Sequence, residues 1–211
     1  MSDIYSILLV VLIIATSGAI SLLFYRLGVF SSETTRKFIH ILVSNSVFIC
    51  AYNFESLGFA VLGPCLFIII NYLGTKSKYA ASLGMTDSAR HIGLVYYPAS
   101  LALLVFLKYT NYIEAQDLIA GILVMGYGDG LAALYGSKFG KKKIGRTGKT
   151  LEGSIILFFA AILVMVLFTN YNITMVVVIA LIAAVIELYS KNGFDNISVP
   201  LITAFLGAVL C

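Results

Sequence analysis

The apolar positions of the chain fall into eight long runs separated by short polar connections. The runs are continuous and lack the period of two that marks the strands of an outer-membrane barrel. A membrane-spanning helix needs about 20 apolar residues, so 211 residues have room for about eight spans and little else. The pattern predicts an all-α, polytopic integral membrane protein in which residues 1–211 form a single transmembrane catalytic domain. The predicted spans cover residues 4–25, 37–52, 56–72, 91–108, 114–136, 154–169, 172–189 and 196–211.

The composition agrees with this class of protein. Hydrophobic residues make up 60% of the chain and charged residues 11%, whereas a soluble domain carries about a quarter charged residues. This excludes a soluble globular domain, and it excludes a disordered chain, which is polar and highly charged. Three cysteines, Cys50, Cys65 and Cys211, lie in apolar runs at unrelated spacings, which argues against a disulfide framework or a zinc site.

The basic residues indicate how the chain is oriented in the bilayer. Cytoplasmic loops of membrane proteins carry an excess of lysine and arginine. Of the 14 Lys and Arg residues only Lys108 lies outside the connections 26–37, 73–90, 137–153 and 190–195. The pattern therefore places these connections in the cytoplasm and both termini outside, in the cytoplasmic (inner) membrane of a prokaryote. It also accounts for the net charge of +4 without a nucleic-acid partner.

One carboxylate, Asp129, is predicted within or at the end of the fifth span. An ionisable residue at membrane depth is costly and points to function. At 100° per residue, the helix face of Asp129 also carries Ala132, Gly136 and Gly140. A stripe of small residues equally allows close helix packing, and the carboxylate could pair with a lysine. The spacing alone leaves both interpretations open.

The connection 140–154 reads GKKKIGRTGKTLEGS and combines lysines with glycines. Glycines beside lysines allow close approach to phosphate oxygens, and a helix starting near Glu152, capped by Thr150 or Thr147, would add an anion site at its N-terminus. The P-loop pattern does not fit, because Lys143 stands where its first glycine belongs and no buried strand precedes it. The loop is a candidate phosphate site of another kind, and a basic loop against anionic lipid is the alternative.

Two further polar groups are predicted on the same side of the membrane. Arg36 and His40 are four residues apart and share a helix face. The last connection brings Glu187, Asp195 and Asn196, whose oxygens are ligands of the kind that Mg²⁺ prefers beside substrate phosphates. Both groups also have structural alternatives. His40 could be a histidine at a helix end, and Arg36 a basic residue that anchors the topology. Asp195 and Asn196 could cap a helix.

These groups come from four separate segments that the predicted topology brings to one face. Carboxylates for Mg²⁺ with basic residues for phosphate are the parts of phosphoryl transfer, which depends mainly on positioning and charge neutralisation. In a chain that lies almost wholly in the membrane, this predicts a lipid substrate with its head group at the cytoplasmic interface and a nucleotide from the cytoplasm. The converging residues are Arg36, His40, Asp129, Lys149, Glu152, Glu187, Asp195 and Asn196.

The order of these residues resembles the CTP-dependent lipid kinases, a family that includes dolichol kinase, phytol kinase and CTP-dependent diacylglycerol kinase. Their R-K-x-x-H element is matched by Arg36, Lys37 and His40, and the stretches 93–101 and 195–201 resemble further family segments. The chain resembles the compact prokaryotic or chloroplast form. The family's nucleotide motif, D-x-x-A-x-x-x-G-x-x-x-G-x8-K-T-x-E-G, is matched at every fixed position by Asp129, Ala132, Gly136, Gly140, Lys149, Thr150, Glu152 and Gly153.

The resemblance implies phosphoryl transfer from CTP to the hydroxyl of a membrane lipid alcohol, either a polyprenol or phytol-type isoprenoid or diacylglycerol, with Mg²⁺ as cofactor. We expect the catalytic residues to be Asp129, Lys149, Glu152 and His40. We expect the nucleotide to be bound by Arg36, Lys37, Ala132, Gly136, Gly140, Gly148, Thr150, Gly153 and Asn196. We expect Mg²⁺ to be held by some of Asp129, Glu152, Glu187 and Asp195.

Two other functions stay open at this point. A membrane cytidylyltransferase that makes CDP-lipids would also use CTP, Mg²⁺ and an interfacial lipid, but the chain lacks the K-D-x7-H-G-G-x-x-D-R type of signature. A transporter or lipid scaffold would also carry buried charges, although these usually lie at mid-depth. The acceptor alcohol, the use of UTP or ATP, the proton-accepting residue and a homodimer are left open by the sequence.

Overall fold

Every regular element in the described part of the chain is helical, which confirms the all-α prediction. The computed structural model describes residues 2–75, 88–144 and 148–211, and in these ranges it has an isolated β-bridge but no strand. Outside these ranges lie Lys76, Lys78 and Arg146, which count among the basic residues of the predicted cytoplasmic connections, and the candidate helix cap Thr147. The helices are α1 (Asp3–Arg26), α2 (Ser32–Ser44), α3 (Val47–Tyr52), α4 (Leu57–Thr75), α6 (Ser88–Tyr109), α7 (Ala115–Leu123), the π-helix η1 (Val124–Asp129), α8 (Gly130–Phe139), α9 (Leu151–Phe168), α10 (Ile173–Tyr189) and α11 (Asp195–Leu210).

The lengths and composition of these helices mark a membrane protein. Two apolar helices, α10 and α11, are shorter than a usual span, and the second predicted span is divided between α2 and α3. The number of eight crossings therefore stays a prediction. Among the described residues, five segments are long and apolar enough to cross a bilayer: Asp3–Arg26, Leu57–Gly74, Ile92–Tyr109, Ala115–Phe139 and Leu151–Phe168.

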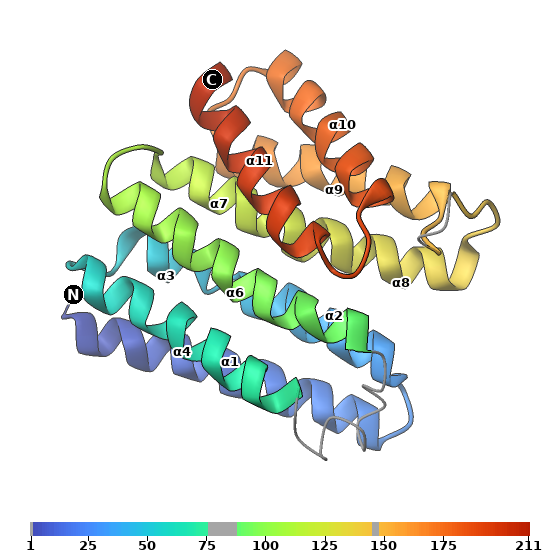
Figure 1. The fold of residues 1–211 in the computed structure, drawn as a ribbon, viewed down its shortest axis with the longest axis horizontal. Helices are drawn as coiled ribbons and strands as arrows, with labels where there is room; N and C mark the ends of the chain where they lie inside the picture. The colour runs from blue at the N-terminus through green and yellow to red at the C-terminus, as the bar shows by residue number, and fades with distance from the viewer. Residues whose placement is uncertain (1, 76–87, 145–147) are drawn as a thin grey trace.

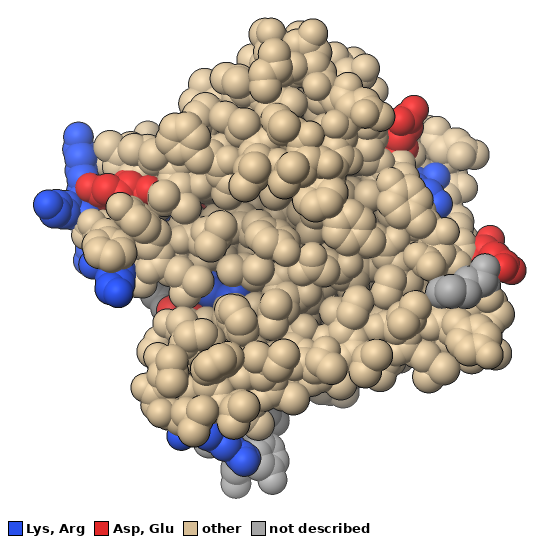
Figure 2. Space-filling view, turned by 180° about the vertical axis from the view of Figure 1, so that it is seen from behind, with Lys and Arg blue, Asp and Glu red and all other residues tan. Residues whose placement is uncertain are grey.

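The helices form a bundle with connections at both ends (Figure 1). The segment that follows α1 and the loop between α8 and α9 lie at the right of that view, and the N-terminus lies at the opposite end. Figure 2 shows lysine and arginine side chains gathered at the end that holds the loop between α8 and α9, which is at the left of that view. A broad tan surface lies beside them, and a few charged residues lie at the far end. The gathering of basic residues at one end, beside an uncharged surface, is the pattern that the sequence predicts.

The second predicted span is not one helix, because its own side chains interrupt it. Ser31 accepts a hydrogen bond from the Thr34 amide and starts α2 earlier than predicted. At the other end, the Asn45 side chain donates to the Ile41 and Leu42 carbonyls, both at 3.1 Å, and Ser44 Oγ donates to the Ile41 carbonyl. Side-chain donors that take these carbonyls compete with helix propagation. The break separates α2 from α3.

The fifth predicted span is the buried centre of the bundle. It comprises α7, η1 and α8, with α2 and α6 on one side and α9 and α11 on the other (Figure 1). A π-helical turn is rare and often marks a functional site, and here it ends at Asp129. Close packing explains its glycines: a Cβ on Gly126 would lie 2.4 Å from Ser44 Cβ, and one on Gly128 would lie 3.0 Å from Leu157 Cγ.

We therefore expect Gly126→Ala to destabilise the protein by about 1–3 kcal/mol, because the added methyl group overpacks the contact between η1 and α2. Adding Ser44→Gly removes the clashing Cβ and should recover much of the loss. Thermal unfolding of purified protein in detergent measures both effects.

The matched control is Gly58→Ala, since a Cβ on Gly58 of α4 meets nothing within 4 Å. This variant should be as stable as the wild type or slightly more stable, because alanine is the better helix former. A Gly126→Ala protein of unchanged stability would show that η1 and α2 do not approach as closely as described.

Candidate active site

Three carboxylates from three separate elements meet inside the bundle. Asp129 ends η1, Glu187 lies in the last turn of α10, and Asp195 starts α11. One oxygen of each lies within 4.8 Å of the other two, and the three residues are only 3%, 4% and 6% exposed. Burying several carboxylates together is strongly unfavourable unless cations accompany them. We call these three residues the carboxylate cluster.

Two lysines supply positive charge to the carboxylate cluster. Lys149 Nζ lies 2.7 Å from Glu187 Oε1 and 2.5 Å from Asp195 Oδ2, and it also donates to the Glu187 carbonyl at 2.6 Å. Lys37 Nζ donates to Asp129 Oδ2. The lysine partner that the sequence left open for Asp129 is therefore present. With all five groups ionised, the cluster keeps one excess negative charge, which suits a further cation.

The environment of Lys149 keeps its ammonium group protonated. Burial disfavours the charged form, but the attraction of Asp195, Glu187 and Asp129 is stronger in total, and together they raise the pKa of Lys149 above its ordinary value. Lys149 therefore acts as a fixed positive charge at neutral pH rather than as a proton donor or acceptor.

Neighbouring polar groups orient the carboxylate cluster. Asp195 Oδ1 accepts hydrogen bonds from the backbone amide and the side-chain amide of Asn196, at 3.0 and 2.9 Å. The Asn196 side chain also donates to the Gly193 carbonyl, in the turn that precedes α11. Ser154 Oγ donates to Glu187 Oε2 at 3.2 Å. Sequence reasoning missed Ser154, whose only signal was its place directly after the K-T-x-E-G segment.

The three fixed glycines of the matched motif allow helices to pack closely. A Cβ on Gly136 would lie 2.7 Å from Thr150 Oγ1, one on Gly140 would lie 2.5 Å from Thr150 Cγ2, and one on Gly153 would lie 2.9 Å from the Ala132 carbonyl oxygen. The small-residue stripe therefore lets α8 lie against the start of α9. Gly148 differs, because its φ is +77° and a Cβ there would meet nothing within 4 Å.

The start of α9 follows the prediction for its cap. Thr150 is the N-cap, and its hydroxyl accepts from the Gly153 amide at 3.2 Å. Glu152 does not join the carboxylate cluster, because both of its oxygens face the Lys142 backbone amide at 3.3 Å. The structure therefore places the predicted metal ligand Glu152 where it ties the basic loop to α9, away from Asp129.

A polar cavity of about 610 Å³ lies over the carboxylate cluster. All nine residues that the sequence predicted to bind the nucleotide line this cavity: Arg36, Lys37, Ala132, Gly136, Gly140, Gly148, Thr150, Gly153 and Asn196. Lys149, Asp129, Glu187 and Asp195 line it as well. The structure thus brings most of the predicted residues of the four segments together in one concave site, which His40 and Glu152 do not line.

His40 lies on the other side of Asp129, in a second and mostly apolar cavity. Its ring lies against that of Tyr97, with 4.0 Å between the ring centroids and an angle of 46° between the ring planes. The sequence singled out Tyr97 only as part of 93–101. The two cavities share Asp129, Lys37 and Asn196, among others. Arg36 also lines both cavities and pairs with Glu33 at 2.7 Å.

Three curated proteins place the chain among known sequences. It is 32% identical to a phytol kinase of Synechocystis sp. over 192 residues, which cover 86% of this chain and 81% of the relative. It is 37% identical to an uncharacterised protein of Methanocaldococcus jannaschii over 69% of this chain and 74% of the relative. It is 28% identical to a dolichol kinase of Schizosaccharomyces pombe over 42% of this chain and 19% of the relative. No protein-family model and no solved structure matches the chain.

Lys149→Ala should lower the free energy of unfolding by about 2–4 kcal/mol, because it leaves Glu187 and Asp195 buried without their shared ammonium group. Thermal unfolding in detergent measures the loss. Lys142→Ala, in the same loop but with an exposed side chain, is the control and should change stability by less than about 0.5 kcal/mol. Equal stability of the two variants would contradict the buried ion pairs.

The stability gap between wild type and Lys149→Ala should also depend on pH in one direction. A lysine whose pKa is raised by folding contributes its full stabilisation of the folded state at pH values below its ordinary pKa of 10.5. This contribution is lost as the pH rises through the pKa of the folded state. The gap should stay constant between about pH 6 and 9 and shrink only above about pH 10.5. A gap that narrows near neutral pH would show that Lys149 is not held in its charged form.

Proposed function

This chain belongs to the lipid kinase family that includes phytol kinase and dolichol kinase, and on this premise we propose that it transfers the γ-phosphoryl group of CTP to the hydroxyl of a membrane lipid alcohol. The products are the lipid monophosphate and CDP. The observation that carries the proposal is the meeting of a polar and an apolar cavity at Asp129. A water-soluble donor and a membrane-bound acceptor would reach one carboxylate from opposite sides.

The carboxylate cluster fits a magnesium ion. Asp129, Glu187 and Asp195 offer three oxygens within 4.8 Å of one another, and oxygen donors of this kind bind Mg²⁺ together with substrate phosphates. When bound, the ion would neutralise charge on the phosphate oxygens. Glu152 has no part in this proposal, because its carboxylate is engaged by the basic loop.

The two lysines of the cluster supply the charge that phosphates need. In the structure Lys149 and Lys37 neutralise the carboxylates, and both line the polar cavity. An ammonium group has three donors that can be redirected. With a cation on the carboxylates, these lysines would turn to the β- and γ-phosphates. Gly148, which has open space above its backbone, allows the nucleotide to approach closely.

The acceptor hydroxyl would enter from the apolar cavity, where His40 and Asp129 both line the wall. Its oxygen forms the new bond to the γ-phosphorus, the bond from that phosphorus to the bridging oxygen of CDP breaks, and CDP leaves. The hydroxyl proton passes to a carboxylate or to His40, which stand at the junction. A general base must lie within hydrogen-bond reach of that proton, and Asp129 and His40 both line the cavity from which the hydroxyl would enter.

The test uses purified protein in detergent with Mg²⁺, a panel of phytol, polyprenol and diacylglycerol, and CTP labelled on either the γ- or the α-phosphate. We expect label from the γ-phosphate alone to enter the lipid, and the productive acceptor identifies the alcohol class. Parallel reactions with UTP and ATP show whether the donor must be CTP. Incorporation of the α-label would instead indicate a cytidylyltransferase, and no incorporation would contradict the kinase proposal.

Asp129→Asn should lower turnover at least about 100-fold, because it removes one of the three carboxylates proposed to hold the Mg²⁺ ion that stabilises the transferring group. Added Mg²⁺ should raise the melting temperature of the wild type and have a smaller effect on Asp129→Asn, which tests ion binding without turnover. Lys108→Ala, at the opposite end of the molecule, is the control. It should match the wild type in turnover and in the rise of its melting temperature with added Mg²⁺. Normal turnover of a folded Asp129→Asn protein would remove Asp129 from the mechanism.

A further inference from the structure

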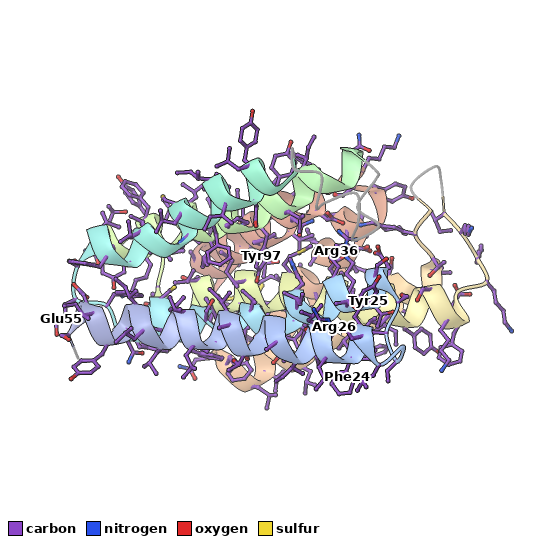
Figure 3. All side chains as sticks on the ribbon, turned by 90° about the horizontal axis from the view of Figure 1, so that it is seen from below. Phe24, Tyr25, Arg26, Arg36, Glu55 and Tyr97 are labelled. Carbon is purple, nitrogen blue, oxygen red and sulfur yellow. The ribbon has the colours of Figure 1, made fainter. Side chains whose placement is uncertain are left out.

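The apolar cavity beside the site is long. It has a volume of about 340 Å³ and is bounded by α1, α2, α4 and α6. Its lining on α1 extends from Val10 to Tyr25, which at 1.5 Å per residue is about 22 Å. The hydrocarbon core of a bilayer is about 30 Å thick. The cavity therefore follows the helices through much of the membrane depth, and Figure 3 shows Arg36 and Tyr97 in the space between α1 and α4.

One end of this cavity is polar and reaches the carboxylate cluster. Lys37, His40, Asp129 and Asn196 line it there. His40 Nε2 is buried and has no hydrogen-bond partner within the described ranges. A buried polar atom without a partner is unfavourable and usually signals a missing one. A hydroxyl group at the end of an apolar chain would provide that partner.

Two glycines that line this cavity make no close helix contact with the described part of the chain. Gly18 of α1 and Gly63 of α4 both line it, and a Cβ on either would meet nothing within 4 Å. This sets them apart from Gly126 and Gly136, where a Cβ would collide with a neighbouring helix. Glycine inside a helix is less stable than alanine by about 0.5–1 kcal/mol. What glycine provides at these two positions is open space within the cavity.

We infer that this cavity holds the hydrocarbon tail of the acceptor alcohol, and that Gly18 and Gly63 keep its path open and so determine how long a tail the enzyme accepts. The inference rests on the proposed kinase function. Gly18 lies seven residues from Tyr25, and Gly63 lies eight residues from Asn71, which ties α4 to α6 through the Leu94 carbonyl at 2.7 Å. These spacings place Gly18 about 10 Å along α1 from Tyr25 and Gly63 about 12 Å along α4 from Asn71.

The experiment places leucine at each glycine and compares acceptors of different length. Gly18→Leu and Gly63→Leu should each narrow the cavity at the substituted position. Geraniol, which has the shortest tail of the acceptors compared, should be phosphorylated as by the wild type. For geranylgeraniol and phytol, whose tails are longer, kcat/KM relative to geraniol should fall by about tenfold or more. Gly18→Ala and Gly63→Ala should give smaller shifts in the same direction.

Matched controls separate blockage of the cavity from a general effect on the helices. Ala19→Leu is next to Gly18 on α1, and Gly58→Leu is five residues from Gly63 on α4. Both positions are exposed and neither lines the cavity. These variants should keep the wild-type preference among acceptors, and melting temperatures confirm that each protein is folded. A folded Gly63→Leu and Gly18→Leu pair with unchanged chain-length preference would overturn the inference.

A second readout needs no turnover. A long-chain alcohol with a diazirine in the middle of its tail, irradiated with the protein in the absence of nucleotide, should label peptides of α1, α4 and α6 that line the cavity. The leucine variants at Gly18 and Gly63 should lose this labelling, and the two controls should keep it. Labelling that is equal in all variants would overturn the inference even for an active kinase. Cavity labelling in a wild type that phosphorylates no alcohol would support it and contradict the proposed kinase function.

Discussion

The rest of the structure depends on the burial of three carboxylates with two lysines. Charges removed from water are unfavourable by several kcal/mol each unless they are paired at close range. Asp129, Glu187 and Asp195 are all less than 10% exposed, and Lys37 and Lys149 reach them from other segments. This requirement brings α2, η1, the start of α9, the end of α10 and the start of α11 to one point.

Glycine serves opposite purposes in this chain, and only the contacts distinguish them. At Gly126, Gly136 and Gly153, the absence of a side chain lets two helices approach until a Cβ would collide. At Gly18 and Gly63, the absence of a side chain leaves a cavity open. The first group brings the helices around the site into close contact, and the second leaves space in the apolar cavity beside it. Bundles in membranes use small residues for close packing in the same way as the first group.

Two environments meet at the carboxylate cluster. One cavity is lined by lysines, glycines and carboxylates, and the other by apolar side chains of the helices that face the membrane. Attraction between charges is stronger where water is excluded, so a site at this boundary can hold phosphates firmly while a membrane lipid reaches it. His40 Nε2, which has no hydrogen-bond partner among the described residues, lies on the apolar side of that boundary.

The linear pattern of residues determined the all-helical fold class, the approximate position of most helices and most of the residues that line the polar cavity, because apolar run length and buried charge follow directly from the order of residues. Tertiary structure decided the rest. The break after Ser44 depends on local side-chain hydrogen bonds, and the partner of Asp129 proved to be Lys37, 92 residues away. Glu152 matches the motif yet faces Lys142, since neighbours in sequence need not share a cavity. The chain order says which residues are available, whereas only packing in three dimensions sets which of them meet.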